Sequence, residues 1–307
     1  RVTYSNNTTF SNPLMMPRFQ NTYGNKEGSS DSWGGQKLAN PSSYNPADFF
    51  NTGVTEINAV TFTVGNTNNQ TYASISTTNS KGILPNNAYN RYNFSIRNTA
   101  KFLDNKMTFD VGAQYIIQDN KNMVGSGAYF NPLASLYLFP RGENFQEVQM
   151  FERFDEGRAI MTQYWPNSIY STDMSMQNPY WIMHRMVNTM NKRRYMFNAS
   201  LKYDITDWFN IAGRVRVDNS DFDSYDKRYA TTNPTFTEGS NKGFYGHAKQ
   251  NDRTVYGDII ASISKNFVED KLSMNINLGN LGDHGNSKPS LSFERDHSEI
   301  AGLIQSV

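Results

Sequence analysis

The stretch "NKMTFDVGAQYIIQD" (residues 105–119) alternates between apolar and polar side chains. Its apolar positions are Met107, Phe109, Val111, Ala113, Tyr115 and Ile117. A period of two is that of a β-strand, because successive side chains of a strand point to opposite faces. The stretch therefore predicts a strand with one apolar and one polar face. The question that it raises is whether the apolar face meets a protein core or lipid.

The same alternation recurs in pairs of segments that are joined by short polar turns. The pairs are 89–103 with 105–119, 193–205 with 208–217, 253–267 with 271–279, and a weaker pair within 60–77. Two alternating segments joined by a short turn predict an antiparallel hairpin. Several of these segments run for ten to fifteen residues, longer than the about 5–6 residues of most soluble strands. We therefore predict an all-β chain made of long antiparallel strands.

Long segments without strong alternation separate these hairpins. We predict loops at about 119–191 and 219–251, and we expect another loop at 279–297. Each hairpin then has a tight turn at one end and a long loop at the other. Outer-membrane barrels have this asymmetry, with short periplasmic turns and long extracellular loops. We therefore predict part of a large transmembrane β-barrel, whose apolar face meets lipid and whose polar face lines a wet lumen. A soluble β-sandwich predicts the same alternation with the apolar face inward.

Two groups of side chains agree with the barrel. Aromatic residues collect near the tight turns, where an interfacial girdle would lie: Phe102, Tyr203, Trp208, Phe209 and Phe267. Polar and charged residues share the other face of the predicted strands: Asp110, Gln114, Lys202, Arg214 and Arg216.

The composition excludes several classes of protein. The chain of 307 residues has no cysteine, which excludes a disulfide scaffold and a thiolate metal site. Its net charge of +1 offers no electrostatic basis for nucleic-acid binding. Its mean hydropathy is −0.67, and no run reaches the about 18 apolar residues of a membrane helix. The first residue is Arg1, and we expect residues 1–307 to be a fragment of one β-barrel domain.

Short motifs in a fixed order resemble the SusC/RagA-type TonB-dependent transporters. The motifs are "PRFQNTYGNKEG" (17–28), "WGG" (33–35), "TGVT" (52–55), "GILPN" (82–86), "YNRYN" (89–93), "NPYW" (178–181) and "LKYDITDWFNIAGRVRVD" (201–218). Each is weak by itself, and their order along the first two thirds of the chain carries the resemblance. The chain would correspond to the N-terminal part of the barrel, without the plug and the TonB box.

The resemblance implies a function and a set of partners. Members of this family are large barrels that import oligomeric nutrients across the outer membrane of Gram-negative bacteria, usually oligosaccharides and sometimes oligopeptides. They draw energy from the TonB complex through the plug, and a SusD-like surface lipoprotein covers their external loops. We therefore expect TonB-dependent import, with glycan preferred over peptide. The partners would be the lipoprotein lid, the TonB complex, outer-membrane lipid and the substrate, with no nucleic acid.

The residues give little support for catalysis. The four histidines are scattered, and no zinc, P-loop, dinucleotide or nucleophile-elbow motif is present. We expect no enzyme activity and no cofactor. The acidic stretch "DNSDFDSYD" offers a weak calcium candidate in Asp218, Asp221, Asp223 and Asp226, although it lacks EF-hand spacing. Its simpler interpretation is an exposed acidic loop.

The predicted loop 119–191 contains the best candidates for substrate contact. They are the aromatic residues Tyr164, Trp165, Tyr170, Tyr180 and Trp181. Flat aromatic rings can hold sugar rings, but they can equally pack a long loop into a small core of its own. The methionines of this segment, which include Met183 and Met186, favour packing. The "NPYW" stretch has helical spacing and predicts a short helix before the next strand.

Two further functions are consistent with the same residues. A secreted all-β carbohydrate-binding protein or adhesin would use the aromatic loops on a soluble sandwich. A passive porin-like barrel would need neither a plug nor TonB.

Overall fold

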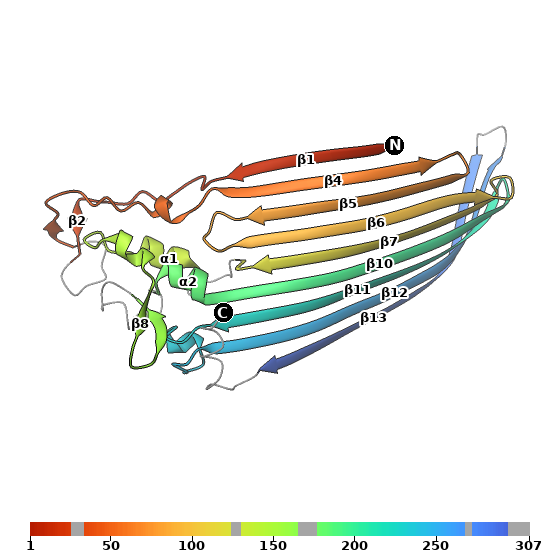
Figure 1. Cartoon of the computed structure of the whole chain (residues 1–307). Helices are drawn as coiled ribbons and strands as arrows, with labels where there is room; N and C mark the ends of the chain where they lie inside the picture. The colour runs from red at the N-terminus through yellow and green to blue at the C-terminus, as the bar shows by residue number, and fades with distance from the viewer. Residues whose placement is uncertain (26–33, 124–129, 165–176, 268–271, 294–307) are drawn as a thin grey trace.

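The computed structural model describes residues 1–25, 34–123, 130–164, 177–267 and 272–293. Its main element is one antiparallel sheet of nine strands in the order β1-β4-β5-β6-β7-β10-β11-β12-β13 (Figure 1). The strands are β1 (Val2–Ser11), β4 (Gly53–Gly65), β5 (Asn69–Lys81), β6 (Ala88–Phe102), β7 (Met107–Lys121), β10 (Met186–Thr206), β11 (Phe209–Arg228), β12 (Phe244–Phe267) and β13 (Leu272–Phe293). The prediction of an all-β chain with long antiparallel strands is confirmed.

The four predicted hairpins are β4–β5, β6–β7, β10–β11 and β12–β13. In each pair the first strand ends and the second begins at the same end of the sheet, which we call the turn end, and the long connections lie at the other, the loop end (Figure 1). In the β6–β7 turn, Asp104 and Asn105 have φ angles of 53° and 67°. Asparagine and aspartate tolerate this left-handed conformation better than most residues, which is why they suit the turn.

The structure corrects the predicted loop boundaries. β11 continues to Arg228 and β12 begins at Phe244, so the predicted loop 219–251 is a connection of residues 229–243. The predicted loop 119–191 is likewise a connection of residues 122–185. The region 279–293, expected as a loop, is paired with β12 as part of β13, while 294–297 lie outside the described residues. These strand ends carry mostly polar side chains on both faces, so they show no apolar alternation in the sequence. The backbone pairing between neighbouring strands nevertheless continues through them.

The strand register places the alternating apolar residues on one face. One row across the sheet reads Val60, Ile75, Phe94, Tyr115 and Tyr195. On β10 this apolar band comprises Tyr195, Phe197, Ala199, Leu201, Tyr203 and Ile205. Ten residue steps span about 33 Å along a strand, or about 25 Å across a membrane for a strand tilted by about 40°. The band therefore has the height of a barrel's lipid-facing surface.

The opposite face, which we call the polar face, carries ion pairs between neighbouring strands. The predicted residues Asp110, Gln114, Lys202, Arg214 and Arg216 share this face in the observed register. Arg214 contacts Asp258 at 2.6 Å, Arg194 contacts Asp218 at 2.5 Å, and Arg97 contacts Asp110 at 2.8 Å. Cross-strand pairing satisfies these charges within the sheet.

The apolar band is largely uncovered in the described part of the chain. Ile259 is 63% exposed, Ile96 54% and Ile75 53%. No second large sheet packs on it among the described residues, as a sandwich would require. In the same residues, no helix is long and apolar enough to cross a membrane.

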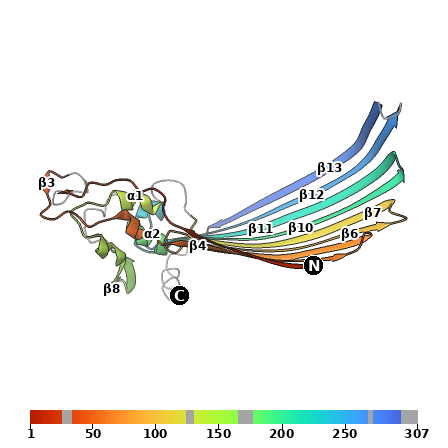
Figure 2. The same ribbon diagram turned by 90° about the horizontal axis from the view of Figure 1, so that it is seen from above.

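The connections at the loop end fold together into a compact unit, which we call the cap (Figures 1 and 2). Its elements are α1 (Pro132–Tyr137), α2 (Pro179–Arg185), the 3₁₀ turns Pro46–Phe49, Phe145–Gln149 and Pro234–Phe236, and the two-stranded pairs β2 (Tyr23–Gly24) with β3 (Gln36–Lys37) and β8 (Glu152–Asp155) with β9 (Ile160–Gln163). Its connected core comprises Tyr44, Phe49, Leu136, Phe139, Phe145, Val148, Trp181, Ile182, Met183, Met186 and Phe236. This buried core lies in the cap rather than beneath the sheet.

Candidate functional site

Aromatic rings from separate segments build the core of the cap. The Tyr44 ring lies 4.3 Å from that of Phe145 and 5.2 Å from that of Phe139, measured between ring centroids. The Tyr44 hydroxyl donates a hydrogen bond of 2.6 Å to the carbonyl of Leu136 in α1. Burial raises the pKa of Tyr44 well above its usual range, so this hydroxyl stays protonated and keeps donating. The connection before β4 is thereby fixed to the connection after β7.

Arg141 is a buried cation in this core. It is 2% exposed, and its guanidinium carbon lies 4.3 Å from the Phe19 ring centroid and 4.7 Å from that of Tyr44. Burial lowers its pKa, while the neighbouring Tyr44 opposes that effect. The nitrogens Nη1 and Nη2 have no hydrogen-bond partner among the described residues. Stacking between two rings is the contact that offsets the desolvation of this charge.

Helix α2 forms as the sequence predicts, and Asn178 fixes its start. The Asn178 Oδ1 accepts hydrogen bonds from the backbone N–H groups of Tyr180 and Trp181, at 2.9 and 3.4 Å. Pro179 at the first helical position has no N–H to leave unpaired. The Asn178 Nδ2 donates to the carbonyls of Val148 and Tyr164, at 2.8 and 3.0 Å. One fully buried amide therefore caps the helix and connects it to two other segments.

The structure places the predicted aromatic candidates in different environments. Trp181 has no exposed surface and donates through Nε1 to the Thr232 hydroxyl at 3.0 Å, so the packing interpretation describes it. Tyr180 is half-buried against Phe49, with ring centroids 4.9 Å apart. Tyr164 lies beneath the Arg153 guanidinium, 3.4 Å from the ring centroid. Trp165 and Tyr170 lie outside the described residues. Substrate contact by Tyr164 or Tyr180 stays a prediction.

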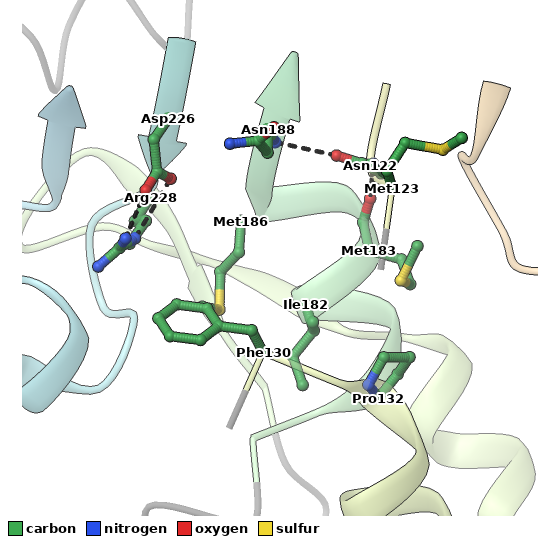
Figure 3. Close-up of a pocket in the computed structure, with 10 residues that line it drawn as sticks. All are labelled: Asn122, Met123, Phe130, Pro132, Ile182, Met183, Met186, Asn188, Asp226 and Arg228. Carbon is green, nitrogen blue, oxygen red and sulfur yellow. Dashed lines mark hydrogen bonds and ion pairs between the residues drawn. The ribbon is translucent and has the colours of Figure 1, made fainter. Parts of the chain in front are cut away.

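A cavity of about 310 Å³ lies where the cap meets the loop end of the sheet (Figure 3). Its lining is Asn122, Met123, Phe130, Pro132, Ile182, Met183, Met186, Asn188, Asp226 and Arg228. The strand residues Asn188, Asp226 and Arg228 have the parity of the polar face in the β10–β11 register. The cavity therefore opens on the same side of the sheet as the polar face, with an apolar floor from the cap and a polar rim from the strands.

Asparagine side chains hold the floor of this cavity in place. The Asn122 Nδ2 donates to the carbonyls of Met183 and Asn86, at 2.8 and 3.0 Å, and the Asn86 Nδ2 donates to the same Met183 carbonyl at 2.8 Å. The Asn188 backbone N–H donates to Asn122 Oδ1 at 3.0 Å. Asn86 and Asn122 have φ angles of 57° and 51°, a conformation that asparagine tolerates. These bonds anchor the C-terminal end of α2 to the ends of β7 and β10.

An ion pair between Arg228 and Asp226 forms the charged part of the rim. The Arg228 guanidinium also lies 4.9 Å from the Phe130 ring centroid and 4.6 Å from that of Phe244, and it donates to the Phe236 carbonyl. The positive charge is thus fixed in position at the edge of an apolar floor. Such an arrangement can bind an uncharged or apolar side chain while offering a charged pair to polar groups beside it.

The acidic candidates for calcium lie within β11 rather than in a loop, which corrects that part of the prediction. Asp218 and Asp226 point to the polar face, whereas Asp221 and Asp223 point to the apolar-band face. Asp218 pairs with Arg194, Asp223 with His247, and Asp221 accepts from Asn251 at 2.5 Å. The described residues contain no group of three or more side chains that could hold a metal ion. Strand alternation places the four carboxylates on two opposite faces of the sheet. This separation could not be predicted while the segment was interpreted as a loop.

Among the cavity residues, Asp226 alone was a candidate predicted from the sequence, and it was predicted as a calcium ligand. Met183 and Met186 were expected to pack, and they do so in the core while also lining the cavity. Asn122, Asn188 and Phe130 belong to none of the sequence motifs. They meet because β7, β10 and the cap converge at the loop end, which periodicity within one segment cannot predict.

Comparison with known proteins gives likeness in structure only. No protein-family model matches the chain, and no curated protein matches it. It is similar to a chain of the "RagAB peptide importer in the 'closed-closed' state", with 14% identity, a TM-score of 0.60, and coverage of 96% of this chain and 36% of that one. It is also similar to a chain of the "RagAB peptide transporter", with 12% identity, a TM-score of 0.52, and coverage of 80% of this chain and 26% of that one. A third similar chain is that of the same importer in its "'open-open' state", with 13% identity, a TM-score of 0.50, and coverage of 96% of this chain and 40% of that one.

The chain thus spans between 26% and 40% of the length of the transporter chains that it resembles. At 12–14% identity the likeness concerns the fold alone.

Proposed function

We propose that this chain forms part of the wall and outer cap of a β-barrel in the outer membrane of a Gram-negative bacterium, and that the whole protein imports oligomeric nutrients. One observation carries the proposal: a single sheet has an uncovered apolar band on one face, ion pairs on the other, and its long connections at one end. Bilayer-spanning strands need this two-faced pattern, because one side meets hydrocarbon and the other meets water.

The position of the cavity supports a role in uptake. It opens beside the polar face at the loop end, which in this orientation is the outer mouth of the lumen. A substrate that enters from outside would meet the cap before it reaches the ion pairs along the strands. The resemblance to the SusC/RagA-type transporters adds TonB-dependent energy coupling and a SusD-like lipoprotein lid to the proposal.

We propose peptide as the better substrate class, with glycan as the alternative. Among the described residues that line the cavity only Phe130 is aromatic, and the Arg228 guanidinium lies over its ring. A sugar-binding site usually needs exposed ring faces, whereas methionine, asparagine and an ion pair suit side chains and amides of a peptide. The structural neighbours that belong to a peptide importer point the same way. Contact by Tyr164 and Tyr180 would instead favour glycan.

Uptake by cells tests the proposal. A strain that lacks the whole protein is complemented with the gene, and uptake of labelled oligopeptides and of labelled oligosaccharides is measured with and without TonB. We expect peptide uptake that is lost without TonB and a lipoprotein that co-purifies from detergent. Uptake that survives the loss of TonB would favour a passive porin-like barrel. A protein that is soluble without detergent would contradict the proposal and favour the adhesin.

A pair of variants on one strand tests the cavity. Asn188→Arg places a long side chain in the cavity, whereas Asn198→Arg places the same side chain on the polar face ten residues closer to the turn end. We expect Asn188→Arg to reduce peptide uptake several-fold and Asn198→Arg to leave it close to wild type. Equal effects of the two changes would show that the cavity has no special role in substrate binding.

A further inference from the structure

Above the apolar band, the same face of the sheet becomes charged. In the register of β10, β11 and β12, the row Tyr195–Asn219–Arg253 is followed by Arg193–Asp221–Asn251 and then by Asn191–Asp223–Lys249. With Asp119 of β7, Lys227 and His247, the charged residues of these rows form what we call the outer charged band. Alternation points it away from the cavity and from the polar face. If the sheet is part of a barrel wall, these side chains lie outside the lumen.

The cations of the outer charged band are accessible. The Lys249 side chain is 61% exposed, and that of Arg193 is 41% exposed even though it contacts Asp119 at 2.8 Å. Arg253 is exposed, and its side chain forms no hydrogen bond or ion pair with another described residue. Arg253 and Lys249 are four residues apart on one strand, about 13 Å, and Arg193 lies two strands away, about 10 Å. Three cations therefore surround a patch of the size of a small headgroup.

Groups that bind sugar hydroxyls lie between these cations. Asp221 accepts from Asn251 at 2.5 Å, and Asn251 also donates to Asn219. One row beyond Lys249, toward the loop end, the Tyr225 ring is stacked on the His247 ring, with centroids 4.4 Å apart. Carboxylates would repel a headgroup that offered phosphate alone, but they can accept hydrogen bonds from hydroxyl groups. The mixture suits a ligand that carries both phosphate and sugar.

The apolar band continues below this patch and extends beside it toward β4. A depression of about 530 Å³ crosses β4 to β10 on the apolar band, and its lining includes Ala73, Ala113, Tyr195 and Phe197. The alanines are small residues between larger ones, which leaves room for an alkyl chain. The depression borders Arg193, because Tyr195 and Arg193 are successive side chains on this face of β10.

We propose that the outer charged band binds the phosphorylated glycolipid of the outer leaflet, with its phosphates at Arg193, Lys249 and Arg253 and its acyl chains on the apolar band. The inference rests on the proposed function, because it requires the loop end to face outward. Cations next to an apolar surface attract anionic lipid headgroups. A plain phospholipid would offer no sugar hydroxyl groups to the carboxylates and amides between the cations.

Lipid binding by the whole protein in detergent tests this inference. Diphosphorylated lipid A is titrated into the protein, and bound lipid is counted by native mass spectrometry, with dephosphorylated lipid A and phosphatidylglycerol as comparison lipids. The test variant combines Arg193→Gln, Lys249→Gln and Arg253→Gln. A matched control removes three cations from the polar face through Arg97→Gln, Lys202→Gln and Arg216→Gln.

We expect the test variant to bind lipid A about tenfold to a hundredfold more weakly, and the control variant to bind like wild type. Dephosphorylated lipid A and phosphatidylglycerol should both bind more weakly than lipid A. Arg253→Gln alone removes no side-chain hydrogen bond or ion pair within the described chain, so it serves if the triple variant fails to fold, and it should still weaken binding several-fold. Equal loss in the two triple variants, or no loss in Arg253→Gln, would overturn the inference.

Failure of this inference can be told apart from failure of the proposed function. If the protein enters membranes and takes up peptide while the outer variants bind lipid A normally, only the lipid site is wrong. If the protein is soluble without detergent, the proposed function itself fails.

Discussion

At the scale of single residues, Asn178 connects the cap more than any apolar residue does. Its backbone N–H donates to Gln163 Oε1 at 2.9 Å, in addition to the four bonds of its side-chain amide. An asparagine before Pro-Tyr-Trp suggests a helix start, and the helix was predicted. The carbonyls of Val148 and Tyr164 could not be predicted as partners, because they come from segments 30 and 14 residues away.

Substitution of Asn178 separates capping from cross-linking. Asn178→Ser keeps an oxygen for the helix N-terminus but leaves two buried carbonyls without donors, so we expect a loss of about 1–3 kcal/mol in the free energy of unfolding of the cap. Asn178→Ala loses the cap as well and should cost about 1 kcal/mol more. Asn131→Ser at the start of α1 is the matched control, because the Asn131 side chain accepts a hydrogen bond of 3.0 Å from the Leu133 backbone N–H at the N-terminus of that helix. Urea unfolding of the whole protein in detergent measures all three, and a loss in Asn131→Ser equal to that in Asn178→Ser would refute the cross-linking role.

His184 should make the stability of the cap depend on pH. Burial lowers its pKa, the cations Arg185 and Lys121 lower it further, and Glu152 opposes them. The unfolded chain takes up this proton near pH 6.5, and the folded cap takes it up only at lower pH. The stability that neutral His184 contributes to the folded cap is therefore complete above about pH 6.5 and is lost as the pH falls below that value.

A melting series from about pH 7.5 to pH 5 tests this dependence on His184. The unfolding midpoint of the cap should fall over this interval, and His184→Phe, which can keep the stacking on Phe151, should flatten the fall. An unchanged pH profile in His184→Phe would assign the dependence to other groups.

At the scale of elements, the alternation of β4 to β12 was readable from the sequence because one face of each strand is apolar over its middle. β1 was not predicted, since "VTYSNNTTFS" is largely polar and all ten residues are exposed. It is a strand because its backbone pairs with β4 from Val2 to Ser11. The ends of β11 and β12 were assigned to a loop for a similar reason. Their polar side chains pair across strands, a contact that depends on register and not on the composition of either segment.

Strand β10 offers two neighbouring residues that distinguish the faces. Leu201 lies on the apolar band and is 45% exposed, whereas Ser200 lies on the polar face between Asp110 and Arg214. If the band faces lipid, Leu201→Arg should cost about 2–4 kcal/mol near the membrane centre. Ser200→Arg should be tolerated, because it faces water. The amount of each variant in the outer-membrane fraction is the readout, and equal amounts would contradict a lipid-facing band.

At the scale of the whole molecule, the chain has two units with different sources of stability. The cap has a buried aromatic core, whereas the sheet has an uncovered apolar face and is held by its ladder. We expect Trp181→Ala to destabilise the cap by about 3–5 kcal/mol while leaving the strand content unchanged. Trp208→Ala, at an exposed position of the turn end, should leave the cap unchanged. Proteolysis of the cap together with circular dichroism of the strands checks both, and loss of strands in Trp181→Ala would show that the units are not separate.

The pairing of each long strand with its neighbour along the chain has a consequence for how such a sheet is assembled. Within β4–β7 and within β10–β13, successive strands of the chain pair with each other, whereas β10 joins β7 only after the connection of residues 122–185. The sheet can grow by adding one hairpin at a time to an existing edge strand. A lesion in a middle hairpin such as β6–β7 would then stop the hairpins that follow from joining those that came before, whereas a lesion in the cap would leave the growing edge intact.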